Sequence, residues 1–378
     1  MHILIAPNAF KNSLDASKAA EAISNGLLKS RLACTTTLFP VADGGDGTST
    51  LLIDHIKAEH IFTKVHDPLR RQINSSFGWS EKKRTAIIEL ASASGLRLLK
   101  PPEYDPLKAT TLGTGELIIE ALNRQASKII LCIGGSATVD GGIGILEAAN
   151  IQFLDKNKNK ISDLPLSLPA LASIDTCAID KRIAGTEIVI LCDVENTLLG
   201  VHGAARIFGP QKGASGDAIE MLEKRSMHFN KVVLDATGKD MSAIKHGGAA
   251  GGVAASLHAF LNAKLVNGID YFLEITNFDS ELSRADMVIT GEGSIDEQTL
   301  HGKGPYGVAS KAKKYSLPVI GFAGKIPGTI DGSLQKYFDR LIPINDDGIS
   351  LDEAIRNTYS NLEKAARKLG DELAATTD

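Results

Sequence analysis

The stretch His2-Ile-Leu-Ile-Ala6-Pro7-Asn-Ala-Phe-Lys11-Asn-Ser13 joins a short apolar run to a polar loop. The apolar run has the length and composition of a buried strand. A helical pattern follows over residues 16–30, and Asp15 stands where the N-cap of that helix would be. The order then repeats, with a predicted strand at 35–39 and a helix after the loop Asp43-Gly-Gly-Asp-Gly-Thr48. Such alternation of strands and helices predicts a parallel sheet.

The same alternation returns near the other end of the chain. Strands are predicted at 287–290, 319–323 and 341–344, and a helix at 306–315. Ser350-Leu-Asp-Glu353 is a capping-box signature, which predicts that a last helix begins there. Five short parallel strands separated by helices match a doubly wound, flavodoxin-like sheet.

The two ends of the chain are therefore expected to build one split α/β domain from residues 1–63 and 283–378. Residues 64–282 would form a large inserted second α/β domain. In this insert, hairpin-like strands are expected between 61 and 90, and buried strands at 128–133 and 187–192. The polar segment 155–183 is expected to be an irregular surface excursion.

Composition excludes several classes of protein. The chain has 378 residues, and 41 Lys and Arg against 45 Asp and Glu give a formal charge of −4, which disfavours a general nucleic-acid binder. Hydrophobic residues make up 43%, enough for a sizeable core. The sequence contains no run of about 18 apolar residues, as a membrane span needs, and no signal-peptide pattern. The four cysteines lack C-x-x-C spacing, which indicates free thiols and a cytoplasmic location.

Ligands of an open α/β sheet bind at the carboxyl ends of its strands. The loops that follow the predicted strands there are rich in glycine and carry lysines and carboxylates. Phosphoryl transfer needs these groups, because cations and amides hold the phosphates, carboxylates hold Mg²⁺, and a base accepts the hydroxyl proton. The candidate catalytic residues are Lys11, Asp43, Asp193, Glu292 and Asp296. The sequence does not divide the roles of base and metal ligand among them; Asp193 and Glu292 are the candidate Mg²⁺ ligands.

Three loops of the insert add candidate anion sites. Thr110-Thr111-Leu-Gly113-Thr-Gly115-Glu116 opens a helix, Gly134-Gly-Ser136 follows an apolar strand, and Lys212 lies on a further loop. Close packing is the alternative reason for these glycines, and for Gly247–Gly252 the two interpretations stay open. The candidate cofactor-binding residues, with ATP as the expected cofactor, are Gly44, Gly45, Thr111, Gly113, Thr114, Gly115, Gly134, Gly135, Ser136, Lys212, Gly291, Gly293 and Lys303.

Familiar nucleotide motifs are mostly missing. The sequence has no Walker A element, no protein-kinase signature and no G-x-S-x-G elbow. One G-x-G-x-x-G occurs at Gly302-Lys-Gly-Pro-Tyr-Gly307, but it does not directly follow a predicted strand. It is interpreted as a phosphate loop or a helix entry rather than a dinucleotide fingerprint.

Five segments taken together resemble the motifs of the type 1 glycerate kinases, in the same order and across nearly the whole chain. They are Ala6-Pro-Asn-Ala-Phe-Lys-Asn-Ser13, Ala42-Asp-Gly-Gly-Asp-Gly-Thr48, Ile133-Gly-Gly-Ser-Ala-Thr-Val-Asp-Gly-Gly142, Phe208-Gly-Pro-Gln-Lys-Gly-Ala214 and Thr290-Gly-Glu-Gly-Ser-Ile-Asp296. The resemblance implies ATP-dependent phosphorylation of D-glycerate, giving 2-phosphoglycerate, with 3-phosphoglycerate left open. It also implies a split flavodoxin-like domain with a large insert.

The sequence departs from the family pattern at a few positions. The first loop of the family more often reads Asp-Ser-Phe-Lys-Gly, so that an amide, Asn8, stands here in place of a carboxylate. Val139 replaces an asparagine before Asp140, and Thr197 replaces a proline. Lys11, Asp140 and Asp193 are retained.

The resulting hypothesis is a kinase whose substrates bind in a cleft between two domains, with chain crossings near 64 and 282 acting as a hinge. Lys11, Lys212 or Lys303 would hold the phosphates and the glycerate carboxylate. The partners expected are glycerate and ATP, with no nucleic acid and no membrane, and a homodimer is left open. Two other functions remain: an NAD(P)-dependent oxidoreductase, and a non-catalytic sensor of a small phosphorylated acid.

Overall fold

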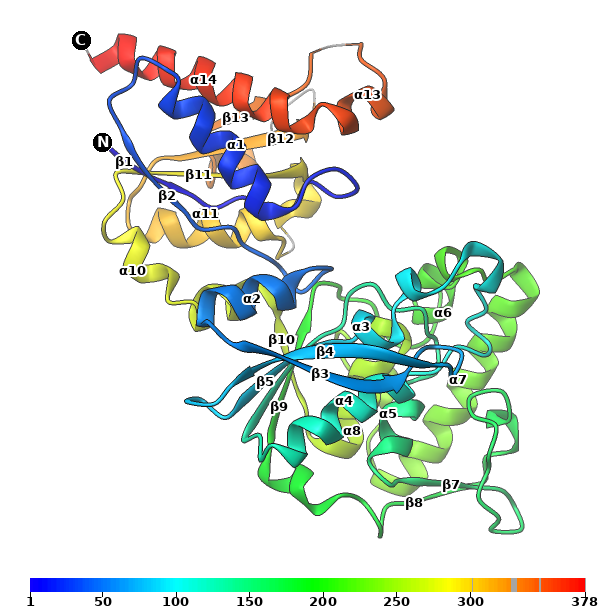
Figure 1. Ribbon diagram of the computed structural model, residues 1–378. Coiled ribbons are helices and arrows are strands. Elements are labelled where there is room, and N and C mark those ends of the chain that lie inside the picture. The colour runs from blue at the N-terminus through cyan, green and yellow to red at the C-terminus, as the bar shows by residue number, and fades with distance from the viewer. Residues whose placement is uncertain (301, 328–331, 347, 378) are drawn as a thin grey trace. The chain divides into compact units, whose positions relative to one another are not determined.

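The computed structural model describes residues 1–300, 302–327, 332–346 and 348–377 (Figure 1). The chain forms two compact units. One, the split unit, consists of Met1–Asp43 and Ile269–Asp378; the other, the inserted unit, is Gly44–Gly268. Each unit has its own sheet, all parallel in the split unit and mixed in the inserted unit, which agrees with the predicted α/β class.

The split unit is built on a five-stranded sheet in the order β13-β12-β11-β1-β2, in which all the pairings are parallel. Its strands are β1 (His2–Ile5), β2 (Thr35–Leu38), β11 (Met287–Ser294), β12 (Val319–Lys325) and β13 (Arg340–Pro343). Its helices are α1 (Ala16–Leu28), α9 (Gly268–Ile275), α10 (Phe278–Leu282), α11 (Gly304–Lys314), α12 (Gly332–Gln335), α13 (Leu351–Arg356) and α14 (Thr358–Thr377).

Both faces of this sheet are buried. Ile3 and Ile5 of β1 pack in one cluster with Leu27 of α1 and Leu362 of α14, and these two helices lie side by side (Figure 1). Leu4 between them is equally buried but lies outside this cluster, because successive side chains of a strand point to opposite faces. The continuous apolar run at residues 2–6 is therefore the pattern of a doubly covered parallel strand.

Two strands of the split unit are longer than predicted. β11 continues to Ser294, so that Gly291, Glu292 and Gly293 lie in the strand and not in a loop. Their backbone pairs with β12, which likewise extends to Lys325. A Cβ atom at Gly291 would overlap the carbonyl oxygen of Phe322, so the glycine permits this close pairing. Sequence patterning missed the extension because glycines are rare inside strands.

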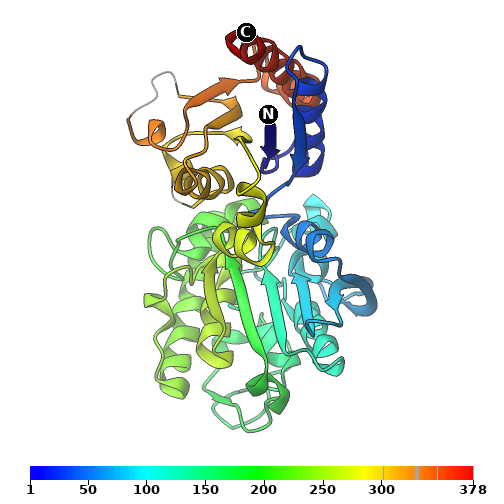
Figure 2. The same ribbon diagram turned by 90° about the vertical axis from the view of Figure 1, so that its left-hand side faces the viewer.

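The inserted unit has a six-stranded sheet in the order β10-β9-β6-β5-β4-β3. Figure 2 shows its strands side by side. β5, β6, β9 and β10 are parallel, and β3, β4 and β5 pair antiparallel. The strands are β3 (Glu59–His66), β4 (Gln72–Ser80), β5 (Thr85–Glu89), β6 (Lys128–Cys132), β9 (Glu187–Cys192) and β10 (Lys264–Asn267). The helices are α2 (Thr48–Ile56), α3 (Ala91–Ser94), α4 (Leu112–Asn123), α5 (Ile143–Ala148), α6 (Ala204–Phe208), α7 (Gly216–Thr237) and α8 (Val253–Leu261).

The segment 155–183, predicted to be irregular, contains one strand of a small antiparallel pair, and the other strand lies just before it. β7 (Gln152–Leu154) pairs with β8 (Ser173–Asp175), and Phe153 of β7 packs near Phe229 of α7. Strands of three residues are too short to show alternation in the sequence.

The predicted domain boundaries at 63/64 and 282/283 differ from the unit boundaries. Residue 63 falls inside β3, which pairs with β4 along its whole length, so α2 and β3 belong to the inserted unit. At the other crossing, α9 and α10 belong almost entirely to the split unit, where the ring of Phe278 lies 4.9 Å from that of Phe39.

All four cysteines are free thiols, and Cys132 and Cys192 are buried, as predicted. Throughout the part of the chain that the structure describes, no helix combines the length and the apolar character needed to cross a membrane.

Candidate active site

Carboxylates gather at the carboxyl end of the split unit's sheet. Glu292 lies near the end of β11, Asp43 follows β2, and Asp296 follows β11. Parallel strands place these positions at one edge, as the sequence predicted for the loops of this sheet. The charges of Asp43 and Asp296 both act on Glu292, so the structure brings these three predicted residues together.

Glu292 is a buried carboxyl group, with 8% of its surface exposed. Burial raises the pKa of Glu292 to about 7, and the negative charges of Asp43 and Asp296 act in the same direction. The positive charge of Lys303 and a hydrogen bond from Thr299 Oγ1 to Glu292 Oε1, 3.1 Å long, oppose this rise in pKa. A carboxyl group whose pKa lies near neutrality can both take up and release a proton there.

Asp43 is held by donors from two other segments of the split unit. Its Oδ2 accepts hydrogen bonds from Nδ2 of Asn8, at 2.9 Å, and from the backbone N–H of Gly304, at 3.4 Å. Gly304 opens α11 and is preceded by Lys303, the N-cap residue of that helix. The interpretation of the G-x-G-x-x-G stretch as a helix entry is therefore confirmed.

The side chain of Asp296 is held by hydrogen bonds, whereas that of Lys11 is exposed. Asp296 accepts from the N–H of Gln298 at 2.9 Å and from Ser294 Oγ at 3.4 Å, which holds its side chain over the turn after β11. Lys11 is exposed; its backbone N–H lies near Gly293, where an added Cβ would be 3.7 Å from that nitrogen. Lys11 thus stands beside β11 with its side chain on the surface.

In the inserted unit, two predicted glycine loops pack directly on each other. A Cβ at Gly134 would lie 2.7 Å from the carbonyl carbon of Gly45, and one at Gly135 would overlap the carboxylate of Asp46. Close approach of two backbones explains why glycine is required at Gly134. The loop after β6 and the loop before α2 therefore form one layer at the carboxyl end of this sheet.

Ser136 and Lys212, both predicted to bind the cofactor, are in direct contact. Lys212 Nζ donates to Ser136 Oγ and to the carbonyl oxygen of Thr138, each at 2.7 Å. Lys212 is only 2% exposed, and burial lowers the pKa of its ammonium group to about 7. The sequence placed Lys212 on an open loop; the structure places it inside the unit, where its ammonium group serves the loop that carries Ser136.

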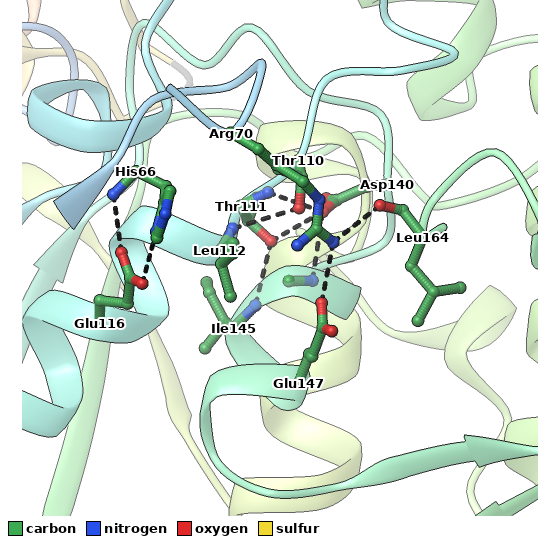
Figure 3. Close-up of polar contacts among 11 residues, drawn as sticks. His66, Arg70, Thr110, Thr111, Leu112, Glu116, Asp140, Ile145, Glu147 and Leu164 are labelled. Atoms are coloured by element: carbon green, nitrogen blue, oxygen red, sulfur yellow. Dashed lines mark hydrogen bonds and ion pairs between the residues drawn. The ribbon is translucent and has the colours of Figure 1, made fainter. Parts of the chain in front are cut away.

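The carboxylate of Asp140 binds at the helix N-terminus at residues 110–116, as Figure 3 shows. Oδ2 of the buried Asp140 accepts from both the N–H and the hydroxyl of Thr111, each at 2.8 Å, and Oδ1 accepts from the N–H of Gly142 at 3.0 Å. The Thr111 hydroxyl in turn accepts from the N–H of Ile145. These bonds tie α4 to α5.

The other candidates in this helix also serve packing. A Cβ at Gly113 would overlap the carbonyl oxygen of His66, and Thr114 Oγ1 lies 2.7 Å from Ser94 Oγ. Gly115 packs against Ala148, where a Cβ would lie 2.6 Å from the alanine methyl group. In this structure Thr111, Gly113, Thr114 and Gly115 join α4 to its neighbours, and their role as a phosphate loop stays a prediction.

The surface beside α4 is fixed by two further polar groups (Figure 3). Glu116 accepts from the backbone N–H of His66 at 2.7 Å, and its other oxygen lies 2.7 Å from His66 Nδ1. Arg70 donates to Glu147 and to the carbonyl oxygen of Leu164, each at 2.9 Å. These contacts support α4 and α5 from outside.

Glu89 is a buried charge that sequence reasoning missed. It ends β5 with 4% of its surface exposed, and it accepts from Ser49 Oγ and from the N–H of Gly47, the latter at 3.4 Å. Arg97 lies 3.6 Å away. The available signal was a glutamate near the end of an apolar strand. Glu89 holds the start of α2, and with it the loop of Gly44 and Gly45.

The two predicted metal ligands belong to different units, because Asp193 follows β9 in the inserted unit whereas Glu292 belongs to the split unit. Asp193 is exposed. Among the residues that the structure describes, no three His, Cys, Asp or Glu side chains come together as a metal site. The carboxylates of the split unit are nevertheless hard oxygen donors, and Mg²⁺ is commonly bound through one or two of these together with substrate phosphates.

Comparisons with known proteins agree over the whole chain. A family model described as the glycerate kinase family matches residues 3–374. A Bacillus subtilis (strain 168) protein named glycerate kinase is 42% identical over 369 residues, covering 98% of this chain and 97% of the relative. An Escherichia coli (strain K12) protein named glycerate 2-kinase is 42% identical over 374 residues, covering 99% of this chain and 98% of the relative.

A solved structure is similar as well. It is the crystal structure of a Salmonella typhimurium LT2 protein assigned provisionally as glycerate kinase 2. It matches with a TM-score of 0.84 and 39% sequence identity, covering 100% of this chain and 99% of that chain.

Proposed function

The chain belongs to the glycerate kinase family, and from this membership we propose that it transfers the γ-phosphoryl group of ATP to the 2-hydroxyl of D-glycerate. It is an enzyme, a phosphotransferase whose acceptor is an alcohol. The observation that carries the proposal is the similarity along the full length to relatives named glycerate kinase, at about 40% identity. The name glycerate 2-kinase of one relative supports 2-phosphoglycerate as the product.

The reaction requires one proton acceptor. The glycerate hydroxyl oxygen forms a bond to the γ-phosphorus while the bond from that phosphorus to the departing ADP oxygen breaks, and the hydroxyl proton leaves. We assign this proton to Glu292, because a base works best when its pKa lies near the working pH. Thr299, which donates to Glu292 Oε1, would orient the carboxyl group.

Charge on the phosphates must be balanced by cations. Lys303 already acts electrostatically on Glu292, which supports a position for its ammonium group near the reacting phosphoryl group. Lys11 is an exposed cation next to β11 and would serve as a second point charge. Asp43 and Asp296, beside Glu292, would hold Mg²⁺ together with phosphate oxygens. Mg²⁺ bound there would neutralise charge that develops on the phosphates.

The direct test is an ADP-release assay with D-glycerate, ATP and Mg²⁺, with the product identified by phosphorus NMR. The expected result is turnover that needs both glycerate and metal, and a coupling pattern of 2-phosphoglycerate. The pattern of 3-phosphoglycerate would overturn the choice of hydroxyl but not the kinase. A folded protein without turnover would leave a sensor of a phosphorylated acid as the better function, and binding without turnover would support it.

Substitutions at two exposed residues can test activity without disturbing the fold. Lys11 and Asp193 lie on the surface, so Lys11→Ala and Asp193→Ala should leave the melting temperature nearly unchanged. We expect kcat to fall by orders of magnitude in each variant. Near-normal turnover in both would remove them from the site.

An oxidoreductase function receives little support. In the dinucleotide fingerprint the glycine loop directly follows a strand, whereas here a short helix at Glu297–Leu300 separates β11 from Gly302. Absence of any absorbance change with NAD(P) and glycerate would agree with this.

We also propose that the split unit is flavodoxin-like. Its five strands, counted in chain order within that unit, lie in the order 2-1-3-4-5 and are all parallel, which is the strand order of that fold.

A further inference from the structure

Lys212 carries a buried charge without an ion pair among the described residues. Its ammonium group donates two hydrogen bonds, one to Ser136 Oγ and one to the carbonyl oxygen of Thr138. The carboxylate that supports its charge electrostatically is Asp140, whose oxygens already accept from Thr111 and Gly142. Burying an ammonium group costs several kcal/mol in an apolar interior. A methionine of similar length could fill the same space without the free-energy cost of burying a charge. The presence of lysine therefore indicates a role other than stabilising the fold.

The hydrogen bond between Lys212 and Ser136 has a fixed direction when Lys212 is protonated. The ammonium group can only donate, so Ser136 Oγ accepts from it, and the hydrogen of the serine hydroxyl points elsewhere. The backbone around Ser136 is held independently: Leu96 N–H donates to the carbonyl oxygen of Gly135, and Ala137 N–H to that of Ser94, each at 2.9 Å. Neither the backbone nor the side chain of Ser136 is then free to turn.

Ser136 also lies where a ligand is expected. It follows the end of β6, a parallel strand in the middle of the inserted unit's sheet, and ligands bind at such ends. Close by in the same loop, the hydroxyl of Thr138 is fully buried and has no partner among the described atoms. The loop thus contains more hydroxyl groups than its own contacts use.

We propose that Lys212 is a positioning residue, whose ammonium group fixes the hydroxyl of Ser136 so that this hydroxyl donates its hydrogen to an oxyanion of the bound substrates. The oxyanion is a phosphate oxygen of ATP or the carboxylate of glycerate. The proposal rests on the proposed function. It gives Lys212 an indirect role, in place of the direct contact with phosphate that its position in the sequence predicted.

The test is a double-mutant cycle on the full-length enzyme with Lys212→Met, Ser136→Ala and the double variant. Each single change should lower kcat/KM by about 10- to 100-fold, the effect of one hydrogen bond to a charged group. The double variant should be no worse than the more affected single one, because both changes remove the same hydroxyl orientation. A rise of KM for ATP alone identifies the phosphate as the acceptor, and a rise for glycerate alone identifies the carboxylate.

Lys239→Met is the matched control. Lys239 also donates to backbone carbonyls, those of His258 and Ala259, but it lies at the end of α7, outside the loop. This variant should change the melting temperature without changing either KM. If Lys212→Met does not fold, Ser136→Ala alone decides: unchanged KM and kcat would overturn the proposal.

Additive losses in the cycle, or a Lys212→Met enzyme with wild-type kinetics, would also overturn it. Failure of the proposed function has a different signature, since the wild-type protein would then be inactive with glycerate and ATP. In that case, amide hydrogen exchange decides the positioning role. Faster exchange at residues 134–140 in Lys212→Met, but not in Lys239→Met, supports it, and equal exchange refutes it.

Discussion

The side-chain amide of Asn8 donates a 2.9 Å hydrogen bond to the carboxylate of Asp43. The two residues follow β1 and β2, which are neighbours in the sheet of the split unit. The pair brings a neutral donor, not a further charge, to a site where Glu292 is already influenced by two carboxylates. The type 1 glycerate kinases that the sequence resembles more often have aspartate at the position of Asn8. This chain therefore has one negative charge fewer at the same place.

Asn8→Asp should make the protein more dependent on divalent cations. Two carboxylates at hydrogen-bond distance repel each other, so one of them takes up a proton or a cation binds between them. Without divalent ions at pH 8, we expect the melting temperature to fall by about 2–6 °C, as a loss of ~1–2 kcal/mol implies. Added Mg²⁺ should raise it more than in the wild type. Asn8→Ser, which adds no charge, is the control, and an equal Mg²⁺ response in all three proteins would contradict the prediction.

Glu292→Gln should stabilise the protein at high pH only. Because the pKa of Glu292 is raised from 4.5 to about 7, the folded protein holds this proton more tightly than the unfolded chain does. Stability therefore declines as the pH rises from 4.5 through 7, and the full penalty remains above that range. We expect the variant's free energy of unfolding to exceed the wild type's by on the order of 2–3 kcal/mol at pH 8 and by little at pH 5. Urea unfolding at both pH values measures this.

The matched control for this prediction is Glu297→Gln, which removes an exposed carboxylate in the next turn of the chain. Because Glu297 is exposed, this variant should stay within about 0.5 kcal/mol of the wild type. Glu292→Gln should at the same time lose most of its turnover. A variant that is equally stabilised at both pH values would show that Glu292 does not titrate in this window.

Lys212→Met should show the opposite pH dependence. Burial lowers the pKa of Lys212 from 10.5 to about 7, so the unfolded chain holds this proton more tightly between those values. Wild-type stability gains from rising pH in this window, and the penalty is complete below pH 7. The stability of the variant relative to the wild type should then be higher at pH 6.5 than at pH 9, by on the order of 2 kcal/mol. An effect of Lys212→Met on stability that is the same at both pH values would refute the titration.

Gly113→Ala tests whether the start of α4 serves packing or binding. The added methyl group would overlap the carbonyl oxygen of His66, so we expect a loss of about 2 kcal/mol or more in thermal or urea unfolding. Gly185→Ala is the control, since nothing lies within 4 Å of a Cβ there, and it should stay within about 0.5 kcal/mol of the wild type. A Gly113→Ala protein of normal stability with a raised KM for ATP would instead support a phosphate loop.

The parallel sheets could be predicted because their strands are buried on both faces. Runs such as residues 2–6 and 128–133 are almost purely apolar. Their composition therefore indicates a buried strand without knowledge of the rest of the fold. The domain boundary could not be predicted in the same way. The sequence predicts hairpin-like strands from residue 61 onward, but nothing in the composition of residues 44–66 shows that α2 packs against β4 and β5, which places α2 in the inserted unit together with β3.

The positions of some candidate site residues in the fold could be predicted for a similar reason. The order of strands brings Asp43, Glu292 and Asp296 to one edge of the split unit, and this much follows from counting strands. Burial does not follow from the sequence. It decides that Lys212 lies inside the inserted unit while Asp193 lies on the surface, and that a threonine-glycine helix start is neutralised by Asp140. Each of these depends on contacts between segments far apart in the chain.

The central strand of the split unit has a consequence for biosynthesis. β1 pairs with β11, and Ile3 lies opposite Met287, so during synthesis β1 waits for a partner made more than 280 residues later. At about 5–20 residues per second, this interval is roughly 15–60 s. The inserted unit is one continuous segment and can be complete before then. Until β11 has been made, the apolar side chains of β1 that pack in the core of the split unit therefore lack the strand that lies beside them.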